Sequence, residues 1–448
     1  MLVASTQIQA LIAAVAAMPS ASQGMRAMME RASEFDSPVR AMLTGIALDP
    51  QGRPFADQVL QDYWADEARQ QQLLSSGSLG REVIIGGGFH AAVYAAARVL
   101  SGYPKPLVVE RTDRVGGSFA MTSRPVFFLN SRNRAGTLGP AGDQGASLNY
   151  LPGAPIQASA TSMTAYQTNA DMAFVIRLAL AQYADVVPEA TVLSASDASD
   201  GVTVEVDGLA LLRVGRVIDA RGLGDPIDQP LANGGNIVTF PEFMQRMASR
   251  WPLRQVRRVA VIGGGDAGKC AVESLLGLAP QPFMAAAALD TVDRIDWYAQ
   301  TLPARCEDWQ QQIRGRYQAI GRYLRPDRSG LQRLTVKPRQ ARPVALPDVC
   351  LVEGRSYDLV VLATGNRVDA IDGLELDSFE EYATDFGVVA RRHFTMPVFR
   401  IGPHAQLPFT ERERQDGVAD IAENAVAMFR TAAKTAALAA VLPGLADG

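Results

Sequence analysis

The sequence is poor in cysteine and histidine, the side chains that most often build redox centres and metal sites. Its three cysteines, Cys270, Cys306 and Cys350, lie far apart and form no C-x-x-C pair. This spacing argues against a redox-active disulfide and favours a reducing compartment. Because only three histidines occur in 448 residues, we expect no multi-histidine metal site and no bound metal.

Long hydrophobic runs and tracts of one charge are also lacking. The apolar run over residues 8–18 is too short to span a bilayer, and no positively charged segment precedes it. The formal net charge is −4, and no basic tract typical of a nucleic-acid-binding arm is found. We therefore predict a cytoplasmic protein without membrane or nucleic-acid partners, although Ala-rich sites after residue 18 leave a secretory signal open.

The sequence does have the length and composition of a globular protein with more than one core. Hydrophobic residues make up 48% of the 448 residues and charged residues 20%. Residues 1–80 are rich in Ala, Leu, Met, Gln and Glu, which predicts a helical extension. We expect this extension to pack on the main body or on a partner subunit; a lid over the active site is the alternative.

A strand, a glycine-rich turn and a helix are predicted directly after this extension. An apolar strand runs into Gly86, Gly88 and Ala91, which have the spacing G-x-G-x-x-A. Gly86 permits the turn, Gly88 lets backbone amides approach a pyrophosphate, and Ala91 lets the helix pack closely. A second apolar strand ends on Glu110, 22 residues after Gly88, which suits an acid that binds ribose hydroxyls.

The segment after Glu110 carries the pair Gly116–Gly117, which lets the chain turn over a cofactor near its pyrophosphate. Together these motifs resemble the FAD-binding half of flavoproteins with two dinucleotide-binding domains. That group includes flavin-containing, Baeyer–Villiger and N-hydroxylating monooxygenases and the pyridine nucleotide-disulfide reductases. The FAD-binding residues that we predict in this half are Gly86, Gly88, His90, Ala91, Glu110, Arg111, Gly116, Gly117, Ser118 and Phe119.

Residues 118–165 form a long polar segment that is rich in Ser, Asn, Gly, Pro and Arg. Long irregular segments in compact domains are usually functional or disordered. The resemblance implies that this stretch passes the isoalloxazine ring. We therefore predict catalytic roles for Asn130, Arg132 and Arg134 in binding the flavin or a substrate oxyanion. The alternative is that these arginines are solvated loop charges.

A second glycine-rich turn also follows an apolar strand. Gly263, Gly265 and Gly268 have the spacing G-x-G-x-x-G, and two such turns in one chain predict two bound dinucleotides. The next strand, 294–299, has no carboxylate at its tip, and Arg305 lies beyond it. An arginine there accepts a 2′-phosphate, which favours NADPH, while NADH and an empty, degenerate turn stay open.

Three further segments match the same group of flavoproteins. A predicted strand ends on Asp219, where such proteins return to the FAD domain. Residues 358–366 resemble the D-x-x-x-L-A-T-G-Y motif of N-hydroxylating monooxygenases, with Asn366 in place of Tyr. Gly402 matches the closing FAD motif, although Pro403 replaces its usual Asp.

We therefore add Asp219 and Gly402 to the predicted FAD site. The residues that we predict for the nicotinamide cofactor are Gly263, Gly265, Asp266, Gly268, Lys269, Arg305, Thr364 and Gly365. The stretch 306–343 interleaves arginines with Tyr317 and Tyr323. We expect it to be a solvated helix face rather than a site for an anion.

We predict an α/β protein with two Rossmann-like domains. The FAD domain covers 81–235 and 368–448, an inserted NAD(P) domain covers 250–367, and the helical extension covers 1–80. By resemblance, NADPH delivers hydride to the flavin, and a flavin hydroperoxide formed with dioxygen transfers one oxygen atom to a small organic molecule. A homo-oligomer stays open.

Two other functions stay open as well, because the F-x-G-x-x-x-H-x-x-x-[YFW] fingerprint of flavin-containing and Baeyer–Villiger monooxygenases is missing from the sequence. One is an NAD(P)H-dependent flavin reductase or dehydrogenase that passes electrons to a quinone, a protein or an organic acceptor. The other is a catalytically degenerate FAD-binding protein that acts as an assembly partner through its helical extension.

Overall fold

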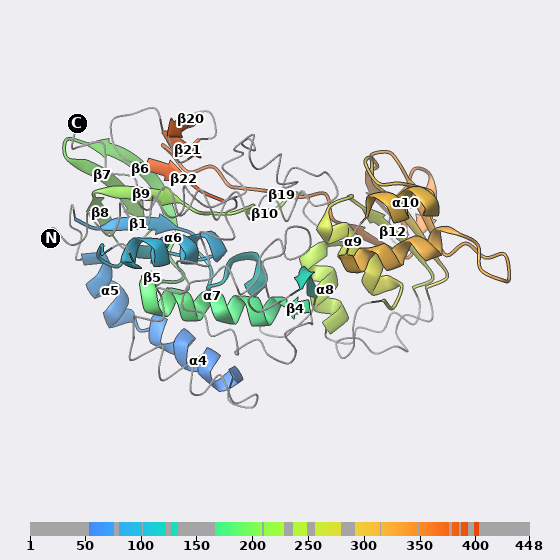
Figure 1. The fold of residues 1–448 in the computed structure, drawn as a ribbon, viewed down its shortest axis with the longest axis horizontal. Coiled ribbons are helices and arrows are strands. Elements are labelled where there is room, and N and C mark those ends of the chain that lie inside the picture. Colours follow the sequence, from blue (N-terminus) through green and yellow to red (C-terminus); the bar gives the residue numbers. More distant parts are fainter. Residues whose placement is uncertain are drawn as a thin grey trace. The chain divides into compact units, whose positions relative to one another are not determined.

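The structure is a computed structural model, and its described residues form two compact units (Figure 1). The first unit lies within Met1–Met121, Ser131–Leu223 and Val368–Gly448, and the second within Thr122–Asn130 and Gly224–Arg367. The described residues are 53–75, 80–100, 102–121, 127–132, 166–207, 210–227, 236–248, 256–278, 292–313, 315–346, 349–375, 379–384, 387–392 and 398–402.

The first unit is built on a seven-stranded sheet with the order β20-β21-β22-β9-β1-β2-β5. Pairing is parallel from β22 to β5 and antiparallel among β20, β21 and β22. Apolar runs such as those of β1 and β2 suit parallel strands that are covered on both faces, and both strands are buried along their length. The strands are β1 (Glu82–Ile85), β2 (Leu107–Val109), β5 (Asp185–Val187), β9 (Arg216–Asp219), β20 (Phe379–Thr384), β21 (Gly387–Arg392) and β22 (Val398–Arg400).

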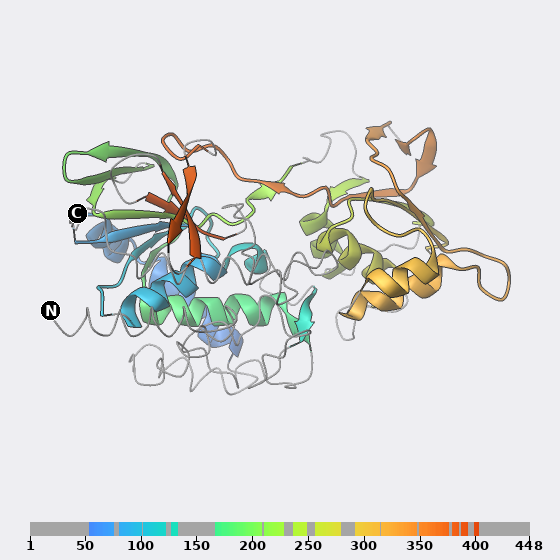
Figure 2. The ribbon, with the colours of Figure 1, turned by 45° about the horizontal axis from the view of Figure 1, so that its top comes forward.

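A small antiparallel sheet covers one face of this sheet. It consists of β6 (Val192–Ala198), β7 (Gly201–Val206) and β8 (Ala210–Val214). Val83 and Ile85 point to the same face of β1, and they share a hydrophobic cluster with Val202 and Val204 of β7. The helices α6 (Phe89–Leu100) and α7 (Asn169–Tyr183) pack against each other on the other side of the large sheet (Figure 2).

In the part of the chain that the structure describes, α4 (Arg53–Trp64) and α5 (Glu67–Ser75) precede the first strand. Within the helical extension predicted for residues 1–80, residues 65–66 separate these two helices. α4 packs against α7, and α5 packs against β5 and β8. Residues 1–52 of the predicted extension lie outside the described residues. Other short elements of the chain are the 3-10 helix η1 (Gly117–Ala120) and the strands β3 (Phe128–Arg132) and β4 (Tyr166–Thr168).

The second unit is built on a five-stranded parallel sheet with the order β11-β18-β12-β13-β14. The strands are β11 (Ile237–Thr239), β12 (Arg258–Ile262), β13 (Arg294–Tyr298), β14 (Leu334–Lys337) and β18 (Leu359–Leu362). The helices are α8 (Phe240–Ala248), α9 (Asp266–Leu275), α10 (Cys306–Gln312) and the 3-10 helix η6 (Gly315–Leu324). An antiparallel sheet of β15 (Pro343–Ala345), β16 (Cys350–Val352) and β17 (Arg355–Tyr357) and a pair of β10 (Asp225–Pro226) with β19 (Asn366–Arg367) complete it.

This architecture confirms the predicted α/β class with parallel sheets. The predicted domain boundaries stay predictions. None of the helices that the structure describes is both long and apolar enough to cross a membrane. Within the same residues, no cluster of three or more His, Cys, Asp or Glu side chains is arranged to hold a metal ion.

Candidate functional site

The first glycine-rich turn joins β1 to α6 at the carboxyl edge of the large sheet. Gly86 has a φ of 99°, and a Cβ atom there would lie 2.9 Å from the carbonyl oxygen of Ala220. This position requires glycine, because residues with a Cβ atom rarely adopt such a φ. At Gly88 a Cβ atom would contact the backbone of Gly117, at 3.6 Å. The turn therefore presents bare backbone where a helix begins, which is an arrangement that accepts a phosphate.

Glu110, which follows β2, is hydrogen-bonded to the same turn. Its Oε2 accepts the amide hydrogen of Gly87 at 2.7 Å. Its Oε1 accepts the amide and the hydroxyl hydrogens of Thr112 at 2.9 and 2.8 Å. Because a carboxylate has about four acceptor positions, these three bonds leave capacity for one more donor. Glu110 is buried yet adjoins the turn, which suits a contact to a ribose hydroxyl.

The pair Gly116–Gly117 lies directly against the first turn. The amide of Gly116 donates to the carbonyl of Gly87 at 2.9 Å. A Cβ atom on Gly117 would lie 3.1 Å from the Cα atom of Gly88, so the two backbones touch. The structure thus brings together the turn, the acid and the glycine pair that the spacing predicts. Ser118 and Phe119 follow on η1, with Ser118 exposed and Phe119 buried.

His90 and Gly402 meet at the start of α6. A Cβ atom on Gly402, which has a φ of 86°, would lie 2.9 Å from His90 Nδ1. His90 is 5% exposed, and burial lowers its pKa to about 3 because a low-dielectric surrounding disfavours the imidazolium form. The neutral ring therefore packs the closing segment onto α6. A direct contact between His90 and a cofactor stays a prediction.

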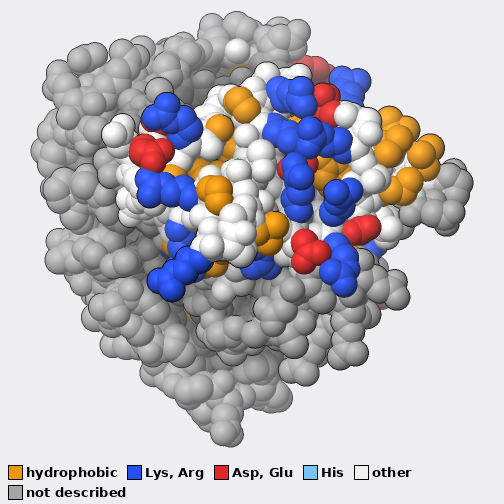
Figure 3. Space-filling view, turned by 90° about the vertical axis from the view of Figure 1, so that its right-hand side faces the viewer, with side chains coloured by type: hydrophobic (Ala, Val, Ile, Leu, Met, Phe, Trp, Pro, Cys, Tyr) orange, Lys and Arg blue, Asp and Glu red, His pale blue; other side chains and the backbone are white. Residues whose placement is uncertain are grey.

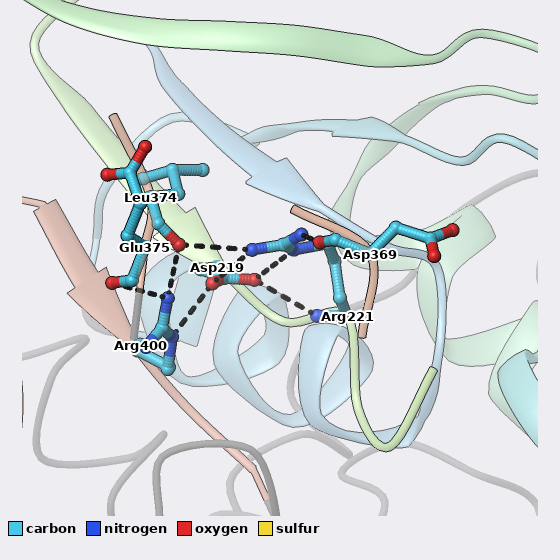
Figure 4. A network of polar contacts seen from close by, with 6 residues as sticks. All are labelled: Asp219, Arg221, Asp369, Leu374, Glu375 and Arg400. Atoms are coloured by element: carbon cyan, nitrogen blue, oxygen red, sulfur yellow. Dashed lines mark hydrogen bonds and ion pairs between the residues drawn. The ribbon is translucent and has the colours of Figure 1, made fainter. Parts of the chain in front are cut away.

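Asp219, at the end of β9, is the centre of a buried ion-pair network (Figure 4). Its carboxylate accepts hydrogen bonds from Arg221 Nε at 2.8 Å and Arg400 Nε at 2.9 Å. Arg221 also donates to the carbonyl of Asp369, and Arg400 donates to the carbonyl of Leu374 at 2.7 Å. These bonds join β9 and β22 to the segment after β19. The carboxylate of Asp219 is thus engaged by two guanidinium groups, and a cofactor contact of its own stays a prediction.

Two other predicted FAD-site residues lie in opposite surroundings. Ala91 is fully buried on α6, as close packing of helix on strand requires. Arg111 lies at the surface, where its NH1 atom is 2.8 Å from Asp369 Oδ2, with 42% and 67% of the two side chains exposed. Arg111 is therefore held beside Glu110 at the edge of the turn.

The side chains of the three predicted catalytic residues lie outside the described part of the chain. Asn130 and Arg132 lie on β3, but their side chains lie outside the described residues. Arg134 and Pro403 lie wholly outside them. The catalytic roles of Asn130, Arg132 and Arg134 stay predictions.

The second glycine-rich turn joins β12 to α9. Gly263 has a φ of 122°, and a Cβ atom there would lie 1.8 Å from the carbonyl oxygen of Ala363. A Cβ atom on Gly268 would lie 2.1 Å from the carbonyl oxygen of Gly263, which also accepts a hydrogen bond from Trp297 Nε1 at 2.8 Å. By contrast, no atom of the described residues lies within 4 Å of a Cβ atom built on Gly265. The turn therefore has one open position, where the helix begins.

The other residues predicted for this turn lie around it. Asp266 begins α9, and its Oδ1 atom is 3.3 Å from Lys269 Nζ. Thr364 and Gly365 follow β18. They come directly after Ala363, whose carbonyl oxygen excludes a side chain at position 263. Gly365 has a φ of 108°. These residues share one edge of the five-stranded sheet.

Arg305, which is predicted to bind a 2′-phosphate, directly precedes α10. Its side chain is 74% exposed, and its Nε atom is 3.4 Å from Asp308 Oδ2. No carboxylate follows β13 before this residue, since the intervening residues are 299–304. The exposed guanidinium is free of burial constraints and can turn toward an anion.

A second basic residue at the same sheet edge was missed by the sequence reasoning. Tyr298 and Lys337 are register partners at the ends of β13 and β14, so the loops after both strands leave one edge. Gln340 Nε2 donates to Gln300 Oε1 at 3.3 Å, which ties these loops together. Arg339 lies in the second loop, 53% exposed. The two loops are about 40 residues apart in the sequence. Only the order of strands in the sheet shows that Arg339 lies in a loop next to the one after β13.

Lys and Arg side chains gather on the face of the second unit that Figure 3 shows. Exposed arginines of this unit pair with carboxylates, namely Arg257 with Asp293, Arg305 with Asp308, Arg325 with Glu307 and Arg339 with Glu353. Arg316 departs from the solvated face predicted for 306–343, because its side chain is only 7% exposed and lies 3.2 Å from the Glu273 carboxylate. A buried cation needs such a partner.

No family model and no curated protein matches this sequence. Solved structures similar to this chain include a flavin-containing monooxygenase from Stenotrophomonas maltophilia (18% identity, 80% of this chain, 97% of that chain, TM-score 0.44). They also include an ornithine N-hydroxylase from Kutzneria sp. 744 (14%, 80%, 98%, 0.48) and an ornithine hydroxylase from Pseudomonas aeruginosa (14%, 81%, 98%, 0.49). Flavin monooxygenases are thus among the structures that the chain resembles, as the motifs predicted.

Proposed function

We propose that this chain is a flavin-dependent oxidoreductase, namely an FAD-dependent monooxygenase that uses NADPH and dioxygen to oxygenate a small organic molecule. One observation carries the proposal. Each of the two units has a glycine turn between a buried parallel strand and a helix, and each turn leaves a glycine with room at the helix start, Gly88 and Gly265. Two such diphosphate sites in one chain call for two dinucleotides.

FAD fits the first turn, in a domain that we assign to 81–235 and 368–448. The diphosphate would lie against the backbone of Gly88 and Gly117, since a Cβ atom on Gly88 would meet only backbone atoms among the described residues. Glu110 keeps acceptor capacity for a ribose hydroxyl beside the turn. Arg111 is placed at the edge of the same turn.

NADPH fits the second turn, in a domain that we assign to 250–367. The diphosphate would approach Gly265 at the start of α9, the open position of that turn. Arg305 is the predicted partner of the 2′-phosphate. Arg339 lies in the loop after β14, the strand that pairs with β13. The lack of a carboxylate directly after β13 favours NADPH over NADH, because an acid there would repel the phosphate.

Bound FAD would supply the redox chemistry, taking hydride from NADPH and passing electrons to dioxygen. The chain itself would hold the two diphosphates by backbone amides and orient the ribose by Glu110. Asn130, Arg132 and Arg134 are proposed to bind the flavin or the substrate. The three free, buried cysteines of the described residues fit a reducing compartment such as the cytoplasm.

The test uses the purified full-length chain. We expect it to retain or take up FAD, seen by flavin absorbance, and NADPH to reduce this flavin under anaerobic conditions. Reoxidation with isotopically labelled dioxygen and a panel of amines, thiols and ketones should place one labelled oxygen atom in a product. A chain that takes up no flavin overturns the proposal. Fast reoxidation by a quinone without oxygen incorporation points to the reductase instead.

A further inference from the structure

Helix α4 packs one of its faces against the rest of the first unit. Asp57, Leu60 and Trp64 have the i, i+3, i+7 spacing of a single helix face. Leu60 and Trp64 are each 1% exposed, and the helix packs against α7 (Figure 1). Asp57 therefore stands at the edge of an apolar contact, where a carboxylate needs a partner.

That partner is Arg177 of α7, and the contact is bidentate. Arg177 Nε donates to Asp57 Oδ1 at 2.5 Å, and NH2 donates to Oδ2 at 2.8 Å. The Arg177 side chain is 5% exposed and that of Asp57 20%. A planar guanidinium paired in this way is fixed in both position and orientation.

The remaining nitrogen of Arg177 contacts the predicted flavin site. NH1 donates to the carbonyl of Val115 at 2.7 Å, one residue before the glycine pair. A Cβ atom on Gly116 would lie 3.3 Å from the same NH1 atom. Asn169, at the start of α7, holds the segment at a second point by donating to the Phe119 carbonyl at 3.1 Å. Residues 115–119 are thus hydrogen-bonded to α7 at both ends.

The same segment bears on the diphosphate turn. The Gly116 amide donates to the Gly87 carbonyl at 2.9 Å, and Gly117 touches Gly88. A continuous series of contacts therefore leads from Asp57 through Arg177 and Val115 to Gly87. If position 177 served only to pack α4 onto α7, an apolar side chain would suffice and would avoid the desolvation cost of a buried ion. Such a side chain would leave the Val115 carbonyl without the hydrogen bond from the guanidinium group.

We propose that α4 is part of the flavin site, and that Asp57 is a positioning residue that holds Arg177 so that the Val115–Gly117 turn seats the FAD diphosphate. This inference rests on the proposed function, since it assumes FAD in the first turn. It assigns to α4 a role in FAD affinity in addition to its packing against α7. Without Asp57, the buried guanidinium loses its counter-charge and its fixed geometry, and the glycine pair loses its support.

The chain offers a matched control in an ion pair that attaches the same extension at another point. Asp185 pairs with Arg81 at 3.0 Å and with Arg69 of α5 at 4.0 Å. Asp185 is the first residue of β5 and the register partner of Leu107, so it lies at the edge of the sheet opposite the glycine turn. D185N therefore weakens the attachment of the extension without touching the turn.

The experiment compares wild type, D57N, R177K and D185N as full-length chains. FAD affinity is titrated by the quenching of flavin fluorescence, and the stability of the flavin-free protein is measured by urea unfolding. We expect D57N to weaken FAD binding by about tenfold or more, as coupled sites typically do. D185N should change it by less than about threefold, as a partly exposed pair does. The visible circular dichroism of the bound flavin should change in D57N and stay unchanged in D185N.

Equal FAD affinities in wild type and D57N overturn the inference, as do equal losses in D57N and D185N. Should D57N fail to fold, R177K decides, because lysine keeps the charge but cannot contact both Asp57 and Val115 with a planar fork. R177K with wild-type FAD affinity then overturns the inference. A wild-type chain that binds no FAD instead overturns the proposed function, so the two failures are distinguishable.

Discussion

At the scale of single residues, neighbouring glycines of the first turn have different tasks. Gly86 is required by the fold, because its φ is 99° and a Cβ atom would lie 2.9 Å from the Ala220 carbonyl. Gly88 has room for a methyl group beside Gly117. Its lack of a side chain is therefore a property of the binding site, since a methyl group would stand where a diphosphate approaches.

We expect G86A to lower the free energy of unfolding by about 2 kcal/mol, because the strained backbone and the close carbonyl act together. G88A should lower it by less than about 1 kcal/mol yet weaken FAD binding strongly. Urea unfolding of the flavin-free proteins and FAD titrations measure both quantities. A G88A variant with wild-type FAD affinity would contradict the assignment of this turn.

His90 predicts a pH dependence of stability. Its pKa is lowered to about 3 in the folded chain, while an unfolded histidine titrates near about 6.5. Between these values the unfolded chain binds the proton and the folded chain does not, so stability falls as pH falls from 6.5 toward 3. From pH 7 to pH 5 wild type should lose about 2 kcal/mol more than H90Q. Identical pH profiles of the two proteins would show that His90 titrates normally.

At the scale of elements, the second unit is held together by a polar network beneath its parallel strands. Asp296 of β13 is 2.7 Å from Lys337 Nζ of β14 and 2.6 Å from the Tyr357 hydroxyl of β17. Burial acts to raise the pKa of Asp296, but hydrogen bonds from Lys337 and Tyr357 outweigh it and lower the pKa. The carboxylate therefore stays charged in the core and links three strands.

We expect K337M to destabilise the protein by about 3 kcal/mol, because it leaves a buried carboxylate without its nearest cation. R339M is the control, because Arg339 lies two residues after Lys337 but forms an exposed ion pair with Glu353. Its loss should lower the free energy of unfolding by less than about 1 kcal/mol. Thermal and urea unfolding of both variants give the comparison. Similar losses of stability in K337M and R339M would mean that the burial of Asp296 does not make its ion pair with Lys337 more important than an exposed pair.

At the scale of the whole molecule, each unit should respond to its own nucleotide. A ligand at about 100 times its Kd stabilises the folded state by about 2.7 kcal/mol. FAD should therefore slow amide hydrogen exchange in 82–121, and NADPH should slow it in 258–313. G88A should abolish the first effect and keep the second, and G265A should do the reverse. Protection of one unit by both nucleotides would contradict the assignment.

Much of this protein was determined by short stretches of sequence. The β1–turn–α6 and β12–turn–α9 units form where predicted, because each depends on an apolar strand and on glycines within a few residues. Glu110 reaches its turn for the same reason, since β1 and β2 are adjacent parallel strands of one βαβ unit. These local rules sufficed for the α/β class and for both glycine turns.

Only the tertiary structure decided which distant residues support those turns. Asp57 and Arg177 are 120 residues apart, and no local pattern marks one as the partner of the other. In the sequence, nothing distinguishes Arg316 from the exposed arginines near it, but in the fold its side chain is largely covered and pairs with Glu273. Gln300 meets Gln340 because β13 and β14 pair in register. Such contacts depend on how elements pack, and packing is a property of the folded chain rather than of any segment.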